Sequence, residues 1–329
     1  MRVFVIGAGV SSTYGCPLTK DLLRDAIESS PRQRMIQRIK EILRYTYPEF
    51  VEEDKNYPNV EDFLSLLEVW KEFNSKIERK PPYSDFDIEQ VRKYVIRILV
   101  ELLDTKLDNI GKNHVILQFA RHLLPNDVII TFNWDLGLEL ALNKMIVKDH
   151  LNDWRYRLPR RATKGDVVLL KAHGSIDWFK TEDITFLKRE RWFFLDDALG
   201  QISVIDSWDY PKYKGREELI PFIIPPTLGK SLQQGEIMGI WADIYRTLQR
   251  AEKVFIFGYS LPQADLHAKF TLRAAIQNNP FHKKANHEGI VKIFNPDSAV
   301  RQKFTEILGT RFAFRRCHFE DINFDVEIT

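Results

Sequence analysis

Three polar side chains in this sequence have the types and spacing to act on a ribose that develops positive charge. Asn133 and Asp135 follow the β-branched run 128–132, and His173 follows a second such run at 167–170. An imidazole can serve as a general base, which typically contributes about 100- to 10,000-fold to a rate. A carboxylate stabilises an oxocarbenium-like ribose, and an amide can position a hydroxyl or a water. The trio therefore predicts cleavage of a glycosidic bond whose leaving group departs neutral.

Each member of this trio also has a structural interpretation. His173 precedes a glycine and can cap a turn. Asn133 and Asp135 belong to the residue types favoured at helix N-termini, and a helical pattern follows them at 136–145. Capping and chemistry are compatible, so both interpretations stay open. Asp177 and Trp178 are near enough in sequence to line the same site, but a structural role is favoured for them.

The first apolar run, at 3–6, ends in GAGVSS at 7–12, with Gly15 and Pro17 shortly after it. A strand that ends in Gly-x-Gly permits a close approach of the backbone, and its exposed amides favour an anion such as a pyrophosphate. Ser12 stands where the dehydrogenase fingerprint G-x-G-x-x-G has its third glycine, and the region about 20 residues on is helical rather than a strand. No P-loop sequence occurs either. These features disfavour hydride transfer.

Five predicted strand ends share a polar character rich in glycine or asparagine. In open parallel sheets, ligands bind beyond the carboxyl ends of the strands. We therefore expect these segments to meet along one rim of a sheet. They are GAGVSS at 7–12, TFNWD at 131–135, KAHGSIDW at 171–178, GYSLPQAD at 258–265 and FNPD at 294–297.

The elements that must position this rim follow from the hydrophobic pattern. Strand-like runs with almost no polar residues alternate with helical patterns, which is typical of a parallel sheet covered on both faces. The predicted fold is α/β, a Rossmann-like parallel sheet with helices on both faces. A large helical insertion is expected at about 18–124, and a small β-rich excursion at about 175–224. We expect residues 1–329 to form one domain.

Composition excludes several classes of protein. The chain has 48 basic and 46 acidic residues, so no overall field requires a nucleic acid or a membrane partner. Two cysteines, Cys16 and Cys317, are too few for a disulfide framework or a four-thiolate zinc site, which favours the cytoplasm. The apolar run after Met1 is too short and too soon interrupted for an export signal or a membrane span. No metal site is expected at His267, His282 and His287, whose spacing is loose.

As an ordered set, the strand-end motifs resemble the sirtuin-like fold, and they are most similar to its divergent bacterial branch found in antiphage defence. The resemblance extends over essentially the whole chain and implies a site for NAD. It implies a catalytic role for His173, with Asn133 and Asp135 beside the nicotinamide ribose. The implied cofactor-binding residues are Gly7, Ala8, Gly9, Ser11, Ser12 and Pro17 in the pyrophosphate loop, Gly258 and Ser260 in a phosphate-contacting turn, and Asn295 and Asp297 at the adenosine ribose.

Two departures from the family separate this chain from its protein deacylases. Those enzymes carry a four-cysteine zinc module after the catalytic histidine, and here no cysteine stands between Cys16 and Cys317. They also carry Asp-Phe-Arg after the glycine loop, where this chain has ProLeuThrLys at 17–20. Both departures fit the defence branch, whose members hydrolyse NAD. The resemblance thus implies an NAD hydrolase (NADase) that uses NAD as substrate without a metal and stays inactive until triggered, with a homo-oligomer or a separate sensor protein as partner.

Two other functions remain open from the sequence. One is a catalytically idle nucleotide-binding regulator, and the other is transfer of ADP-ribose to a protein or nucleic acid. The segment WRYRLPRRATK at 154–164 interleaves aromatic and basic residues and is the one place where a nucleic acid could bind, although a solvated loop is favoured. Hydrolysis is preferred because a pure binding protein has no need of His173, Asn133 and Asp135 together.

Overall fold

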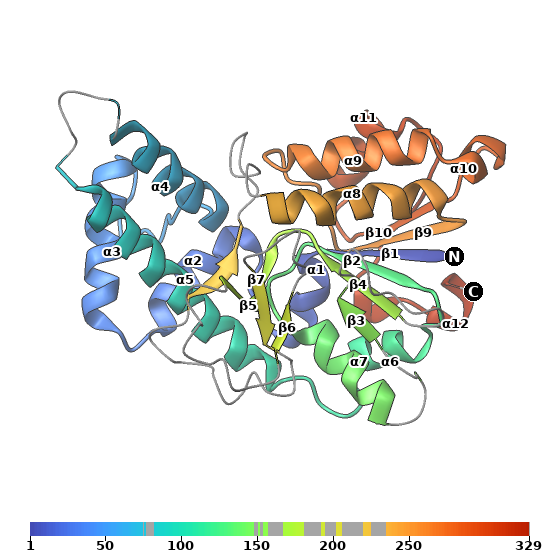
Figure 1. Ribbon diagram of the computed structural model, residues 1–329, viewed down its shortest axis with the longest axis horizontal. Helices are drawn as coiled ribbons and strands as arrows, with labels where there is room; N and C mark the ends of the chain where they lie inside the picture. The colour runs from blue at the N-terminus through green and yellow to red at the C-terminus, as the bar shows by residue number, and fades with distance from the viewer. Residues whose placement is uncertain are drawn as a thin grey trace.

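The structure is a computed structural model that describes residues 1–74, 76, 82–147, 151, 154–156, 167–180, 192–194, 202–205, 220–224 and 235–328. Strands and helices alternate along most of this range (Figure 1). The strands are β1 (Arg2–Ile6), β2 (Val128–Thr131), β3 (Trp154–Tyr156), β4 (Val167–Lys171), β5 (Gly174–Lys180), β6 (Trp192–Phe194), β7 (Ile202–Ile205), β8 (Pro221–Ile223), β9 (Lys253–Phe257), β10 (Val291–Phe294) and β11 (Ala313–Arg315). The helices are α1 (Ala8–Ser11), α2 (Thr19–Ser29), α3 (Gln33–Thr46), α4 (Val60–Asn74), α5 (Asp85–Leu107), α6 (Val115–Arg121), α7 (Gly137–Val147), α8 (Gly235–Arg250), α9 (Leu266–Gln277), α10 (Pro280–Lys284), α11 (Ala299–Leu308) and α12 (Phe324–Glu327).

The main sheet has seven strands in the order β11-β10-β9-β1-β2-β4-β3, and every pairing in it is parallel. The first strand lies near the middle, where Val5 pairs with Ile130 of β2 on one side and with Ile256 of β9 on the other. This confirms the predicted Rossmann-like sheet. Two short edge strands, β3 and β11, were not predicted, because runs of three residues give too little periodicity to recognise.

Alternating side chains of β1 contact the two helical layers. Phe4 and Ile6 belong to the hydrophobic cluster that includes Phe119 of α6, and the rings of Phe4 and Phe119 lie 5.3 Å apart. Val3 and Val5 belong to the cluster on the opposite face, together with residues of α8, α9 and α11. Since successive side chains of a strand point to opposite faces, the apolar residues 3–6 of β1 are buried against both helical layers. The predicted helices on both faces are thereby confirmed.

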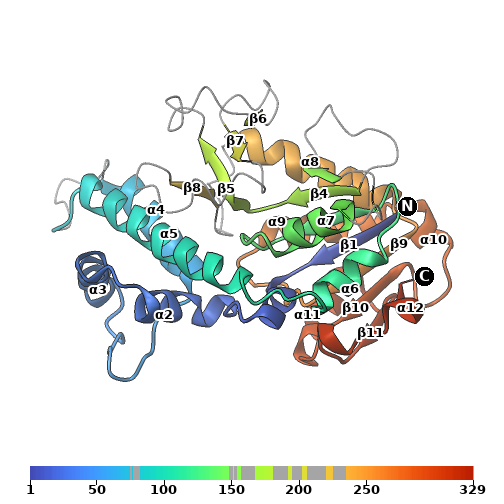
Figure 2. The same cartoon turned by 90° about the horizontal axis from the view of Figure 1, so that it is seen from below.

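The described residues between β1 and β2 form helices joined by turns and loops, as expected for the helical insertion at 18–124. Its helices α2 to α5 extend beyond the sheet (Figure 2). The longest, α5, begins at a capping box in which Ser84 and Asp87 each bond to the other's backbone N–H. Asn59 accepts a hydrogen bond from the N–H of Glu61 at 2.8 Å, which fixes the start of α4.

A second, antiparallel sheet follows β4, with the order β6-β7-β5-β8. It falls within the β-rich excursion expected at 175–224, of which the remaining parts lie outside the described residues. The chain passes from one sheet to the other through Ala172 and His173, and Gly174 opens β5 with φ of +77°. A Cβ at Gly174 would overlap the carbonyl oxygen of Phe222, so the turn that holds His173 requires glycine.

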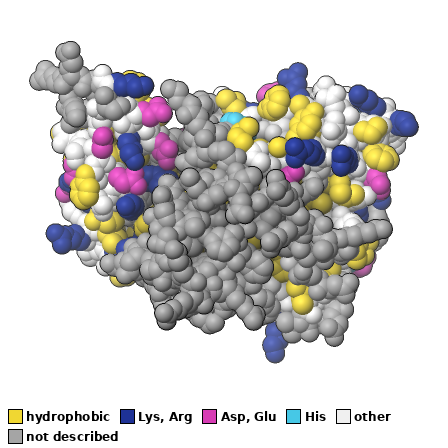
Figure 3. Space-filling view, in the orientation of Figure 1, with side chains coloured by type: hydrophobic (Ala, Val, Ile, Leu, Met, Phe, Trp, Pro, Cys, Tyr) yellow, Lys and Arg dark blue, Asp and Glu magenta, His cyan; other side chains and the backbone are white. Residues whose placement is uncertain are grey.

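The outer surface of α8, α9 and α10 carries hydrophobic side chains among basic ones (Figure 3). Met238, Leu266 and Phe270 are 46%, 46% and 68% exposed, respectively. None of the helices that the structure describes is long and apolar enough to cross a membrane.

Candidate functional site

The glycine loop after β1 packs against the turn after β9. Gly7 donates its N–H to the carbonyl of Phe257, and Gly9 donates to that of Gly258, both at 3.0 Å. A Cβ on Gly9 would lie 2.8 Å from the Cα of Gly258. The glycine pair thus brings two protein backbones together, whereas the sequence pattern indicated an anion at these amides. In this conformation the two amides already have partners, so contact of Gly7 or Gly9 with a ligand remains a prediction.

Replacing Gly258 with alanine should destabilise the fold by about 2–5 kcal/mol. Its φ of +58° is unfavourable for a side chain, and the new Cβ would lie 2.8 Å from the Gly9 backbone. Gly15→Ala is the matched control, since Gly15 also has positive φ but its Cβ would meet nothing closer than 3.4 Å. Urea denaturation should show a loss of about 1–2 kcal/mol for the control. Equal losses in the two variants would contradict this packing.

Asn133 and Asp135 tie the glycine loop to the end of β2. Asp135 accepts hydrogen bonds from Ser11 Oγ at 2.7 Å, from the Tyr14 hydroxyl at 2.5 Å and from the Gly137 N–H at 2.9 Å. Asn133 Nδ2 donates to Ser11 Oγ at 2.8 Å and to the Gly7 carbonyl at 3.1 Å. Both amide hydrogens of Asn133 are therefore used, which leaves its carbonyl oxygen for a ligand. The bond from the Gly137 N–H shows that Asp135 caps the start of α7, in agreement with the capping interpretation.

His173, which follows β4, is held by a carboxylate at the N-terminus of α9. Its Nε2 lies 3.1 Å from Oδ2 of Asp265, which also accepts a bond from the Tyr259 hydroxyl at 2.7 Å. Burial raises the pKa of Asp265, but His173, Tyr259 and the N–H of Ala268 together outweigh it, so the net pKa lies below its usual value. Asp265 thus stays ionised and places the ring proton on Nε2, leaving Nδ1 as the basic nitrogen. This is the base-and-orienter arrangement of proton-transfer sites.

The imidazole of His173 is nearly covered. Its side chain is 8% exposed, and its ring lies 5.5 Å from that of Phe132 and 5.8 Å from that of Trp241, measured between centroids. Phe132 in turn stacks on Tyr259 at 4.1 Å. The ends of β2, β4 and β9 therefore meet around this histidine, as the strand-end pattern predicted.

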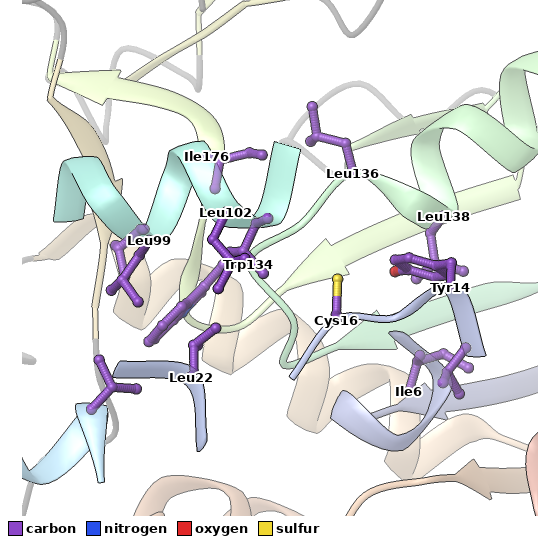
Figure 4. Packing of buried hydrophobic residues seen from close by; sticks show 14 of the residues in the cluster. Ile6, Tyr14, Cys16, Leu22, Leu99, Leu102, Trp134, Leu136, Leu138 and Ile176 are labelled. Carbon is purple, nitrogen blue, oxygen red and sulfur yellow. The ribbon is translucent and has the colours of Figure 1, made fainter. Parts of the chain in front are cut away.

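A pocket of about 50 Å³ lies between the strand ends and the helical insertion. His173 does not line it, but packs behind one of its walls, Phe132. The volume suffices for a few water molecules and is too small for a dinucleotide. Three lining side chains, Cys16, Leu22 and Trp134, belong to the hydrophobic cluster drawn in Figure 4. The lining residues are Ala8, Ser11, Cys16, Pro17, Phe132, Asn133, Trp134 and Asp135 from the strand ends, and Thr19, Leu22, Glu61 and Leu103 from the insertion.

The remaining predicted ligand contacts lie farther along the same rim, after β9 and β10. Ser260 is exposed, and so is Ser12 of the glycine loop. Asn295 is buried and accepts a hydrogen bond from the N–H of Asp297 at 3.0 Å, while Asp297 is exposed and accepts one from Ala299 at 2.9 Å. Because β9 and β10 are the next strands beyond β1, these residues continue away from the pocket. A ligand that spans all of them has to lie across the strand ends.

Glu61 was not recognised in the sequence, although it lines the pocket. It lies in the first turn of α4, and its spacing to the strand-end motifs carries no signal because the insertion folds back over them. Burial raises the pKa of its carboxyl to about 7, with Asp265 and Asp62 adding to the rise and His173 opposing it. Asp265 was also missed as a partner of His173. It lies in the motif at 258–265, but nothing in that motif shows which side chain it faces.

A buried cluster of charged and polar side chains, Lys171, Glu139, Tyr156 and Asp177, lies next to the end of β2. Lys171 donates to Glu139 at 2.8 Å and to the carbonyl of Asp135 at 2.7 Å. The hydroxyl of Tyr156 lies 2.8 Å from Glu139 and 2.8 Å from Asp177. Burial raises the pKa of Asp177 to about 7, although Lys171 opposes the rise. The cluster joins α7, β3, β4 and β5, which agrees with the structural role favoured for Asp177.

Solved structures that the chain matches over most of its length include Sir2 in complex with the inhibitor EX-527, 2′-O-acetyl-ADP-ribose and a deacetylated p53 peptide. It is 14% identical, and the match covers 97% of this chain and 89% of that one with a TM-score of 0.35. A complex described as Sir2, p53 peptide and NAD⁺ is 15% identical over 97% of this chain and 88% of that one, with a TM-score of 0.33. No protein-family profile matches the chain. No curated protein matches it in sequence.

Proposed function

We propose that this protein is an NAD hydrolase that cleaves the N-glycosidic bond of nicotinamide and releases nicotinamide and ADP-ribose. The observation that carries the proposal is the meeting of strand ends around one pocket. Asn133, Ser11 and Asp135 line this pocket, and the His173–Asp265 pair lies behind its Phe132 wall. A regulator that only bound a nucleotide would have no use for a buried imidazole oriented by an ionised carboxylate.

The proposed reaction needs little from the protein beyond a negative field and one base. The C1′–N bond breaks, and its electron pair goes to the ring nitrogen, so nicotinamide leaves neutral. The oxygen of a water molecule then forms a bond to C1′ and gives its proton to Nδ1 of His173. Asn133 orients the ribose or the water through its carbonyl oxygen. The carboxylate of Asp135 accepts hydrogen bonds from Ser11, Tyr14 and Gly137, so it acts as a positioning residue whose charge also favours the ribosyl cation.

The small size of the pocket supports an enzyme that is restrained at rest. A dinucleotide enters only if a wall moves, and Thr19, Leu22, Glu61 and Leu103 of the helical insertion form one wall. We propose that a trigger in antiphage defence moves this wall and leads to depletion of NAD. The partner in this proposal is a second copy of the chain or a sensor protein, and the exposed apolar residues on α8 and α9 support such a contact. Light scattering of the purified protein tests for self-association.

The activity is tested by incubating purified protein with NAD and separating the products by chromatography. The proposal expects nicotinamide and free ADP-ribose in equal amounts, with much less of both from Asn133→Ala. His287→Ala, at an exposed position, serves as a control for substitution and purification. ADP-ribose attached to a macromolecule would instead indicate a transferase. NAD binding without turnover, in the presence and absence of lysate from phage-infected cells, would indicate an idle regulator.

A further inference from the structure

Glu61 is the one acidic residue that the helical insertion contributes to the pocket wall. Its position is fixed because its N–H donates to Asn59 at the start of α4 and its carbonyl accepts from Ser65 at 2.6 Å. The other polar lining residues come from the glycine loop, from the end of β2, and from Thr19 of α2. Glu61 therefore faces, across the pocket, the residues proposed to hold the nicotinamide ribose.

The charged and titratable groups around Glu61 come from five parts of the fold. His173 lies in the turn between β4 and β5, and Asp265 lies at the start of α9. Asp62 is its neighbour on α4, while Cys16 and Asp135 belong to the facing pocket wall. Tyr259 also interacts with Glu61, which contributes to the raised pKa of that phenol. Three of these groups, Asp62, Asp135 and Asp265, are carboxyl groups. Their negative charge favours the binding of a cation beside Glu61.

The expected ligand chemistry follows from this charge balance. Burial holds the pKa of Glu61 near 7, so about half of the molecules carry the carboxylate at neutral pH. A cation that binds against the carboxyl group favours its ionised form and releases the proton from the other half. The nicotinamide ring of NAD carries such a fixed positive charge, whereas the reduced ring of NADH carries none. Glu61 can therefore distinguish the two redox forms of one dinucleotide.

We propose that Glu61, facing Asn133 and Asp135 across the pocket, is a specificity residue that pairs with the cationic nicotinamide ring and selects NAD over NADH. The inference rests on the proposed function, because it requires the nicotinamide half of the ligand to enter this pocket. It goes further by assigning the choice of redox form to the helical insertion, outside the strand-end motifs.

The test compares two ligands in the absence of turnover. One is a carbocyclic NAD analogue, which keeps the pyridinium charge but has a carbon–nitrogen bond that resists hydrolysis, and the other is NADH. For the wild type, the affinity for the analogue should rise about tenfold from pH 6 to pH 8. The reason is that the ionised fraction of a carboxyl group with a pKa of about 7 rises about tenfold over this range. The affinity for NADH should change little. Glu61→Gln should bind the analogue with no such rise, and Glu53→Gln, at an exposed position, should behave as wild type.

A second measurement needs no substitution. Titration calorimetry at pH 7 in two buffers of different ionisation enthalpy should show release of about half a proton on binding of the analogue and none on binding of NADH. Equal proton release for both ligands, or an unchanged preference in Glu61→Gln, would overturn the role of Glu61 while nicotinamide release by the wild type still supported the hydrolase. Failure of both ligands to bind, in the absence and in the presence of lysate from phage-infected cells, would overturn the hydrolase and this inference together.

Discussion

Replacing His173 with alanine should lower the rate of nicotinamide release by about 100- to 10,000-fold, while NAD binding changes much less. The imidazole is the only group we assign to take the proton of the attacking water, so its loss acts on kcat. Asp265 orients the ring from 3.1 Å, and Asp265→Asn should therefore lower kcat less severely and alter the pH profile. Chromatography of released nicotinamide at saturating NAD gives kcat directly.

The control for this experiment has to separate chemistry from packing, because His173 contacts Phe132 and Trp241. His173→Gln keeps a polar side chain in the space and should be nearly as inactive as the alanine variant, with a melting temperature closer to wild type. If either variant kept activity within a factor of about three of wild type, His173 would not be the base. So small a loss lies far below the usual contribution of a general base to the rate.

Lys171→Met should destabilise the protein by about 3–5 kcal/mol. Lys171 is 1% exposed and Glu139 is 0% exposed, so removal of the ammonium leaves a carboxylate buried without its counter-charge. The same ammonium donates to the carbonyl of Asp135, which holds the glycine loop. Urea denaturation of the purified variant, followed by far-UV circular dichroism, measures the loss.

The double variant Lys171→Met/Glu139→Gln tests the cause of that loss. Removal of both charges should recover a large part of the stability, because an unpaired buried charge costs more than the missing pair. Lys55→Met is the surface control, since Lys55 and its partner Glu28 are 60% and 42% exposed, and exposed pairs contribute about 0–1 kcal/mol. A loss below about 1 kcal/mol for Lys171→Met alone would show that the pair has little importance.

The architecture was predictable because its signals are local. Each central parallel strand is mainly a run of apolar residues such as 128–130, and β1 is buried on both faces, so the hydrophobic pattern identified the sheet and the helical insertion. The edge strands β3 and β11 were missed because three residues do not define a period.

The site was predictable only in its location. Strand ends of a parallel sheet share one rim, and this geometric rule predicted that Asn133, Ser11 and Gly258 lie close together. Partners that depend on packing between distant elements were missed, as with Asp265 beside His173 and Glu61 in the pocket wall. The partner of Gly7 and Gly9 was missed for the same reason. A Gly-x-Gly pattern predicts that another group approaches the backbone closely, but it does not identify that group as a phosphate or as the turn at Gly258.

The most direct test of this account is a crystal structure of the protein with the carbocyclic NAD analogue bound. We predict the nicotinamide ring between Asn133 and Glu61, the C1′ equivalent within reach of His173 Nδ1, and the pyrophosphate across the loop at residues 7–12. The helical insertion should have shifted outward to admit the ligand. A dinucleotide bound elsewhere on the protein, or bound here with His173 still sealed behind Phe132 and distant from C1′, would contradict the proposed hydrolase.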